Sequence, residues 1–132
     1  MKSFQIICAF LFVTIAFAAA TKSAYFVFSD KRNEFTIKLC DPVLIAHARG
    51  LANGTITDHK HIMGTIVTEP IWYNPQWNFY MNPTTISFFD SATEVCDASI
   101  SITEGHLAEV GGSFLPDNVW CPWKSFIVRE KI

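Results

Sequence analysis

The stretch that decides the fold is 24-AYFVFSDKRNEFTIKLC-40, in which two β-rich runs flank a short polar segment. In the second run polar residues alternate with the apolar residues Phe35, Ile37 and Leu39. This period of two is typical of a strand that buries one face. The polar residues between the runs favour a short connection. The stretch therefore predicts a β-hairpin with an apolar inner face.

The next segment, 41-DPVLIAHARGLANG-54, predicts a helix. Asp41 suits the N-cap, Pro42 suits the first helical position, and Asn53-Gly54 supplies a left-handed stop. His47 shares one face of this helix with apolar residues at helical spacing. We therefore expect His47 to be a hydrogen-bonded core histidine.

Further strands are expected at 61–70, 76–81 and 125–130, and a turn with a short strand, or the first turn of a helix, within 82–90. Two more helices are expected at 91–98 and 102–110. These elements do not repeat as β-α-β units. The predicted fold class is α+β, an antiparallel sheet with two or three helices packed on one face and one disulfide.

Residues 1–20 predict a secretory signal peptide, with Lys2 before an apolar run and small residues up to Ala20. A membrane anchor is the alternative, but the apolar run is shorter than the ~20 residues that a spanning helix needs. We therefore expect residues 21–132 to form a single secreted domain with no transmembrane segment in the mature chain.

The overall charge argues against nucleic-acid binding. The chain holds 10 Lys and Arg residues against 12 Asp and Glu residues, whereas nucleic-acid binders need clustered cations. Half of the residues are hydrophobic, which is enough for an ordered core. No pattern indicates a cofactor.

Three cysteines lie beyond the signal peptide: Cys40, Cys96 and Cys121. Cys96 and Cys121 occur in one segment joined through a Gly-Gly turn, so we predict that they form a disulfide. Closing that loop should contribute roughly 3–4 kcal/mol. Cys40 is then expected to be a free thiol at a strand end, with pairing between chains as the alternative. No two cysteines have the close spacing of zinc ligands.

The segment 71-IWYNPQW-77 is the best candidate for a binding site. Trp72, Tyr73 and Trp77 supply aromatic rings, and Asn74 and Gln76 supply amide groups. Such rings stack on sugars or anchor a protein partner, so the expected ligand is an extracellular glycan or protein. The alternative is that the rings fold back onto the core.

Asn53-Gly54-Thr55 is an N-glycosylation sequon at the end of the predicted helix. Because a helix end is commonly exposed, we expect Asn53 to be accessible to glycosylation.

No catalytic motif is present, so no catalytic residue is assigned and a non-enzymatic binding module is favoured over an enzyme. Inhibition of a secreted enzyme is a variant of the binding function. The rival is a small secreted hydrolase that assembles Asp58, His59, His61 and His106. Asp58, His59 and His61 are too few to complete a zinc site, so no metal site is assigned.

A set of phrases spread over residues 25–130 carries a family resemblance: LCDPVLIAHARGL, HIMGTIV, YNPQWNFYMNPTTISFFD, EVCDASI, HLAEVGGSFLP and WCPW. In this order they resemble a family of small secreted domains related to the N-terminal domain of a slime-mould calmodulin-binding protein. The resemblance implies that Cys96 and Cys121 are the family's cysteine pair. It also implies that Cys40 is a departure, since relatives tend to have threonine there. It implies no activity for this chain, and calmodulin binding is not transferred to a chain expected to be secreted.

Overall fold

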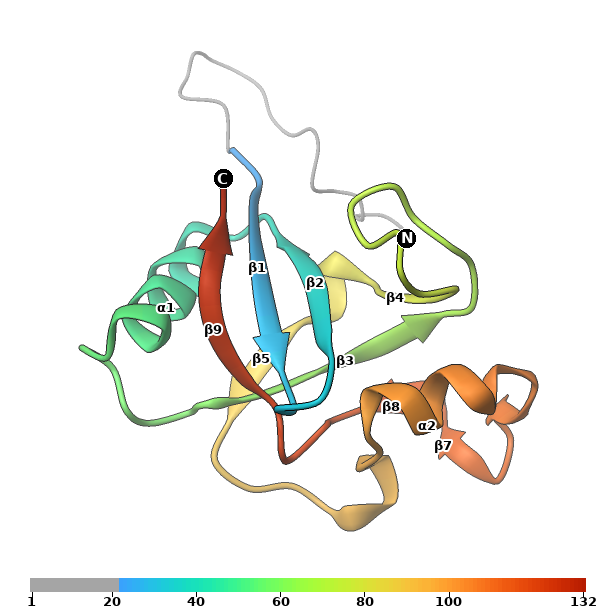
Figure 1. Ribbon diagram of the computed structural model, residues 1–132. Helices are drawn as coiled ribbons and strands as arrows, with labels where there is room; N and C mark the ends of the chain where they lie inside the picture. Colours follow the sequence, from blue (N-terminus) through green and yellow to red (C-terminus); the bar gives the residue numbers. More distant parts are fainter. Residues whose placement is uncertain (1–21) are drawn as a thin grey trace.

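The computed structural model describes residues 22–132 (Figure 1), so the predicted signal peptide lies outside the described residues. One 12-residue helix, several short helical turns and nine strands make up this part of the chain. In order they are β1 Ala24–Ser29, β2 Glu34–Leu39, α1 Pro42–Asn53, β3 His61–Val67, β4 Tyr80–Met81, η1 Pro83–Thr85, β5 Ser87–Phe89, η2 Glu94–Cys96, α2 Ile100–Gly105, η3 Leu107–Glu109, β6 Val110–Gly111, β7 Phe114–Pro116, β8 Val119–Trp120 and β9 Phe126–Lys131.

The predicted hairpin is confirmed and forms two strands of an antiparallel sheet in the order β2-β1-β9. Phe28 pairs with Phe35 across the hairpin, and both side chains are fully buried. On the other edge of β1, Ser29 pairs with Phe126 of β9. The first and last strands of the described chain therefore lie side by side (Figure 1).

Helix α1 begins and ends at the residues that the sequence indicates. The Asp41 carboxylate accepts a hydrogen bond from the Val43 N–H at 2.8 Å. Gly54 has a φ of 83°, a left-handed conformation that glycine adopts without steric cost. His47 is hydrogen-bonded as predicted, since its Nε2 lies 2.8 Å from the His59 carbonyl oxygen. It is half-buried at the rim of the core, not within it.

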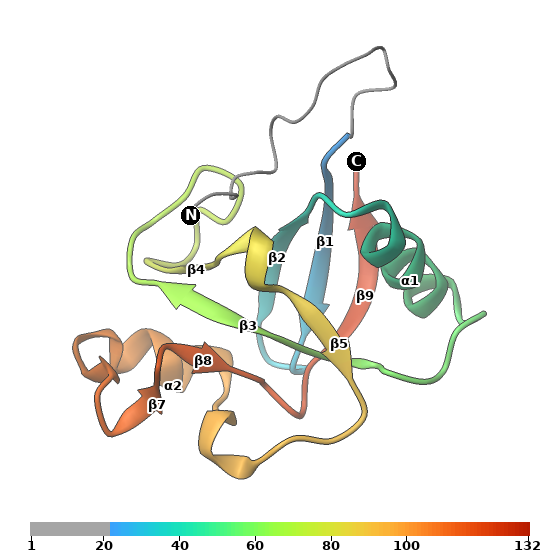
Figure 2. The ribbon, with the colours of Figure 1, turned by 180° about the vertical axis from the view of Figure 1, so that it is seen from behind.

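Strand β3 forms a second layer behind this sheet (Figure 2). Along its length it pairs with β5, β8 and β4 in turn. The backbone of Thr65 bonds toward Asn82, whereas that of Ile66 bonds toward Asn118, so β3 has neighbours on both edges. A Cβ at Gly64 would lie 2.7 Å from the Met81 sulfur. Glycine at this position therefore permits the close approach of β4.

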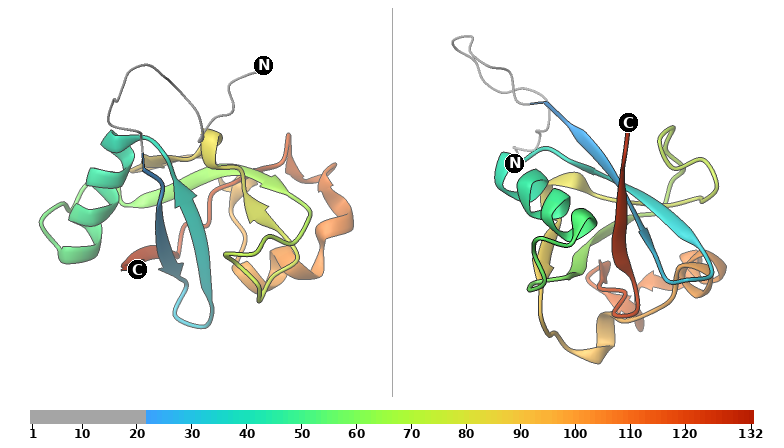
Figure 3. Two further views of the ribbon diagram at one scale, coloured as in Figure 1. Left: turned by 90° about the horizontal axis from the view of Figure 1, so that it is seen from above. Right: turned by 60° about the vertical axis from the view of Figure 1, so that its left-hand side comes forward.

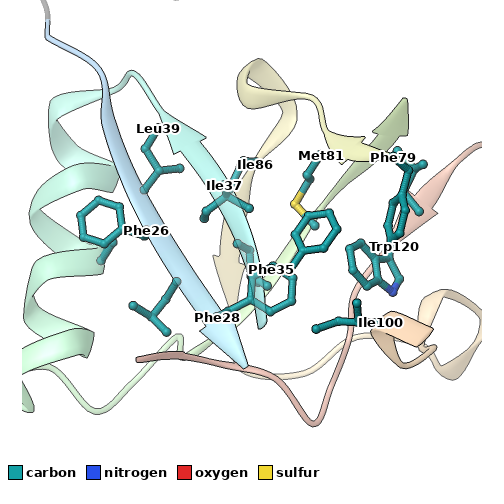
Figure 4. Packing of buried hydrophobic residues seen from close by; sticks show 14 of the residues in the cluster. Phe26, Phe28, Phe35, Ile37, Leu39, Phe79, Met81, Ile86, Ile100 and Trp120 are labelled. Carbon is teal, nitrogen blue, oxygen red and sulfur yellow. The ribbon is translucent and has the colours of Figure 1, made fainter. Parts of the chain in front are cut away.

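The core lies between these two layers and centres on Trp120 (Figure 4). Its ring centroid is 5.7 Å from that of Phe28, 5.2 Å from that of Phe35 and 5.3 Å from that of Phe79. The indole N–H of Trp120 donates to the Ala98 carbonyl at 2.9 Å. This large aromatic side chain is thus buried without leaving its polar atom unpaired.

The domain is α+β and mostly β, which corrects part of the predicted architecture. It contains several antiparallel sheets rather than one, and β6 pairs with β7 in parallel. The helices do not gather on one face. Figure 3 shows α1 on one side of the domain and α2 at the other end. No helix within residues 22–132 is long and apolar enough to cross a bilayer.

The predicted helix at 91–98 is replaced by the single turn η2, and the helix predicted at 102–110 shortens to α2 at 100–105. Tertiary hydrogen bonds explain the first difference. The Cys96 carbonyl accepts from the Cys121 N–H at 2.7 Å, and the Asp97 carboxylate accepts from the Trp123 N–H at 3.0 Å. Bonds to the segment 121–123 thus replace those that a helix would make. Of the strand predicted at 76–81, only β4 forms.

Candidate binding surface

The segment 71–77 lies along the free edge of β2 and covers its exposed backbone groups. The Asn74 side-chain oxygen accepts from the Thr36 N–H at 3.0 Å. The Trp77 indole N–H donates to the Glu34 carbonyl at 2.8 Å. An uncovered edge strand invites pairing with other chains. These two side chains therefore protect the edge of the sheet.

Asn74 and Trp77, both predicted as ligand-binding residues, are engaged inside the domain. Asn74 is only 3% exposed, and its amide nitrogen also donates to the Phe79 carbonyl at 3.3 Å. Trp77 is half-buried and packs against the main core. The next residue, Asn78, donates through its side chain to Glu104 at 2.7 Å. The segment is therefore fixed along β2 and at its junction with α2.

Trp72 projects from this fixed segment with 75% of its surface exposed. Its ring centroid lies 5.5 Å from that of Tyr25 at an interplanar angle of 61°, and 5.5 Å from that of Tyr73 at 89°. Tyr73 is itself buried, and this burial raises the pKa of its hydroxyl group. Gln76 is exposed. Of the five residues predicted from sequence, the structure thus presents Trp72 and Gln76 to solvent.

The predicted disulfide between Cys96 and Cys121 is present, with the two Cα atoms 5.1 Å apart. Both cysteines lie in a small cluster with Phe89. The prediction of a free thiol at Cys40 is wrong for this structure. No cysteine among residues 22–132 is free, and Cys40 is disulfide-bonded.

His61 is buried in a box of aromatic rings at the start of β3. The centroids of Phe89, Trp123 and Phe126 lie 5.4, 5.0 and 5.2 Å from its ring. Only 8% of the residue is exposed, and its Nδ1 has no hydrogen-bond partner. Burial is the main cause that lowers the pKa of His61, and the charge of Lys60 lowers it further. The site therefore favours neutral imidazole.

The other residues of the hydrolase hypothesis face different surroundings. His59 is exposed, with Nδ1 3.3 Å from Asp58 and Nε2 3.4 Å from Asp90. His106 lies just after α2, and its Nδ1 is 2.9 Å from the Ile102 carbonyl oxygen. The structure thus pairs His59 with carboxylates but does not assemble the three histidines around one substrate position. In the described part of the chain no three or more His, Cys, Asp or Glu residues are grouped so as to hold a metal ion.

Asn53 is exposed at the end of α1. Its side-chain oxygen accepts from the Thr55 N–H at 3.0 Å and from the Thr55 hydroxyl at 2.7 Å. The asparagine and threonine of the sequon are therefore both on the surface and in mutual contact.

Together these features define a class of protein: a small, mostly β, α+β domain with one internal disulfide and an ordered, solvent-facing aromatic loop. The particular family follows from comparison with known families. The family model of the N-terminal domain of a slime-mould calmodulin-binding protein matches residues 22–132, so the chain belongs to that family. This match confirms the relation indicated by the sequence phrases. No curated protein and no solved structure matches the chain.

Proposed function

We propose that this chain is a secreted, non-enzymatic binding module that recognises carbohydrate through a surface centred on Trp72. The observation that carries the proposal is the 75% exposure of Trp72. A tryptophan ring offers a large apolar face on which the C–H face of a sugar stacks. Large aromatic side chains are mostly buried in folded domains, so one held in solvent is informative.

Preorganisation of the ring supports the proposal. Trp72 follows a fixed path because Asn74 and Trp77 tie its segment to β2. Tyr25 and Tyr73 contact its ring and restrict its orientation. Binding to a ring already in place costs less conformational entropy than binding to a mobile one.

Secretion fits the disulfide and the sequon. Disulfides form and persist in oxidising compartments, and Cys96–Cys121 is such a bond. The sequon at Asn53 is exposed, as glycosylation in the secretory pathway requires. Residues 1–20 would direct the chain into this pathway.

A glycan array probed with the purified mature protein tests the proposal. We expect binding that soluble sugar competes away and that Trp72→Ala abolishes. Val43→Ala is the matched control, because Val43 is 74% exposed on α1, away from Trp72. Retained binding in Trp72→Ala would refute this site. Binding to cells that is lost after protease treatment, with no glycan bound, would indicate a protein partner instead.

A further inference from the structure

A polar hollow of about 350 Å³ lies beside the turn that joins β1 to β2. Five of its six lining residues belong to this turn and the strand ends, and the sixth comes from the loop that carries Trp72. They are Ser29, Lys31, Arg32, Asn33, Glu34 and Gln76. The hollow therefore combines hydrogen-bonding side chains with two cations.

The charge available in this hollow is positive. The Glu34 carboxylate is engaged by the Arg129 guanidinium through two contacts of 2.6 and 2.9 Å. Neither Lys31 nor Arg32 forms an ion pair with any residue from 22 to 132. Two exposed cations thus stay available for an anion, while the nearest carboxylate is compensated.

The turn that carries these cations is ordered by its own hydrogen bonds. The Asp30 carboxylate accepts from the Arg32 N–H at 3.0 Å and the Asn33 N–H at 2.8 Å. Its second oxygen accepts from the Ile100 N–H at 3.3 Å, which connects the turn to α2. The position of the turn is therefore fixed before any ligand binds, as is that of the loop bearing Trp72.

The hollow and Trp72 lie along one face of the same sheet. Tyr25, which contacts the Trp72 ring, and Ser29, which lines the hollow, are four residues apart on β1. Side chains four residues apart on a strand point to the same face, and they are separated by roughly 13 Å. Gln76 reaches the hollow from the Trp72 loop itself. The spacing suits a chain of several sugar rings and not a single sugar.

We infer that the hollow is the anion-binding part of an extended glycan site, so that the chain prefers acidic oligosaccharides. One sugar stacks on Trp72, and an anionic group on a neighbouring ring binds Arg32 and Lys31. This rests on the proposed carbohydrate function. A guanidinium group suits this role because its planar donors match the two oxygens of a carboxylate.

Titration calorimetry with matched saccharides tests the inference. The probes are a short galacturonate oligomer, its methyl ester, a sulfated dextran oligomer and the neutral dextran oligomer. We expect an anionic oligomer to bind roughly tenfold tighter than its neutral counterpart, the worth of one charge-assisted hydrogen bond. The preference should shrink as salt is raised. Comparison of the two anionic probes identifies carboxylate or sulfate as the favoured group.

Two variants with equal net charge locate the effect. Arg32→Gln should remove most of the preference for acidic saccharide without unfolding the domain, because its side chain is exposed and unpaired within residues 22–132. Arg49→Gln removes one positive charge from α1 and should retain the preference. Equal binding of acidic and neutral oligomers would overturn the inference but leave carbohydrate binding through Trp72 intact. Failure of every saccharide to bind would overturn the proposed function as well.

Discussion

Two aromatic stretches of this chain each place tryptophans beside a proline, yet they have opposite fates. In 71-IWYNPQW-77, Trp72 is 75% exposed, whereas in 119-VWCPW-123, Trp120 is fully buried. Both stretches are largely irregular, and both are tied firmly to the fold. The first is tied by side-chain hydrogen bonds to the edge of β2. The second is tied by a disulfide and by packing in the core.

The contrast separates residues that build the scaffold from residues that the scaffold displays. Trp120 joins the two layers through contacts with three phenylalanines. Trp72 contacts only tyrosines among the described rings and leaves most of its surface to solvent. The buried stretch therefore maintains the fold, and the exposed stretch is the one available to a ligand.

The largest expected effect is on stability at Trp120. Trp120→Ala should lower the free energy of unfolding by about 3–5 kcal/mol, because it opens a cavity at the centre of the core. Trp72→Ala should change it by no more than about 0.5 kcal/mol, as for most surface substitutions. Denaturant unfolding of both variants measures the difference. Equal losses would show that Trp72 is also a scaffold residue and would remove the contrast.

A smaller effect is expected where the exposed loop meets β2. Asn74→Ala leaves the buried Thr36 N–H without its acceptor, which should cost about 1–3 kcal/mol. Asn74→Asp retains an acceptor for Thr36 but loses the donor to the Phe79 carbonyl, so we expect a partial loss. Because the loop positions Trp72, ligand affinity should fall with Asn74→Ala even where the variant remains folded. Unchanged stability would show that the edge of β2 does not need this loop.

The smallest effect concerns His61, which packs beside the buried stretch. Its pKa is lowered by burial and by Lys60, while Asp90 and Asp97 oppose the shift. The unfolded chain therefore takes up a proton near pH 6.5, before the folded protein does. Stability should be complete above that pH and decline as the pH falls from there through the folded pKa.

His61→Phe keeps an aromatic ring in the box and removes the titrating group, so it should flatten this part of the pH profile. Thermal unfolding of both proteins between neutral and mildly acidic pH measures the effect. An equally steep decline in His61→Phe would assign the pH dependence to other groups.

The sequence predicts the parts of the fold that local rules determine. The hairpin follows from the alternation in β2, and α1 follows from Asp41, Pro42 and Gly54. The disulfide follows from the proximity of its cysteines along the chain. The predicted helix at 91–98 fails because long-range bonds to residues 121–123 replace helical ones, and no local pattern reports such bonds.

The candidate surface is only partly predictable for the same reason. The aromatic loop stands out in the sequence, but its composition does not reveal that Asn74 and Trp77 point to β2 while Trp72 points to solvent. Tyr25, Lys31 and Arg32 were not identified from sequence. Their one signal is the parity of the strand, which places Tyr25 on the face opposite Phe26. That signal becomes useful only when the position of the loop is known.

The most direct test of the central claim uses the indole N–H signals of the four tryptophans in a proton–nitrogen NMR spectrum, recorded during titration with an acidic oligosaccharide. The account predicts that the signal of Trp72 shifts until saturation. The signals of Trp77 and Trp120, whose N–H groups are bonded inside the domain, should stay in place. Saturable binding that leaves the Trp72 signal unmoved would contradict the account.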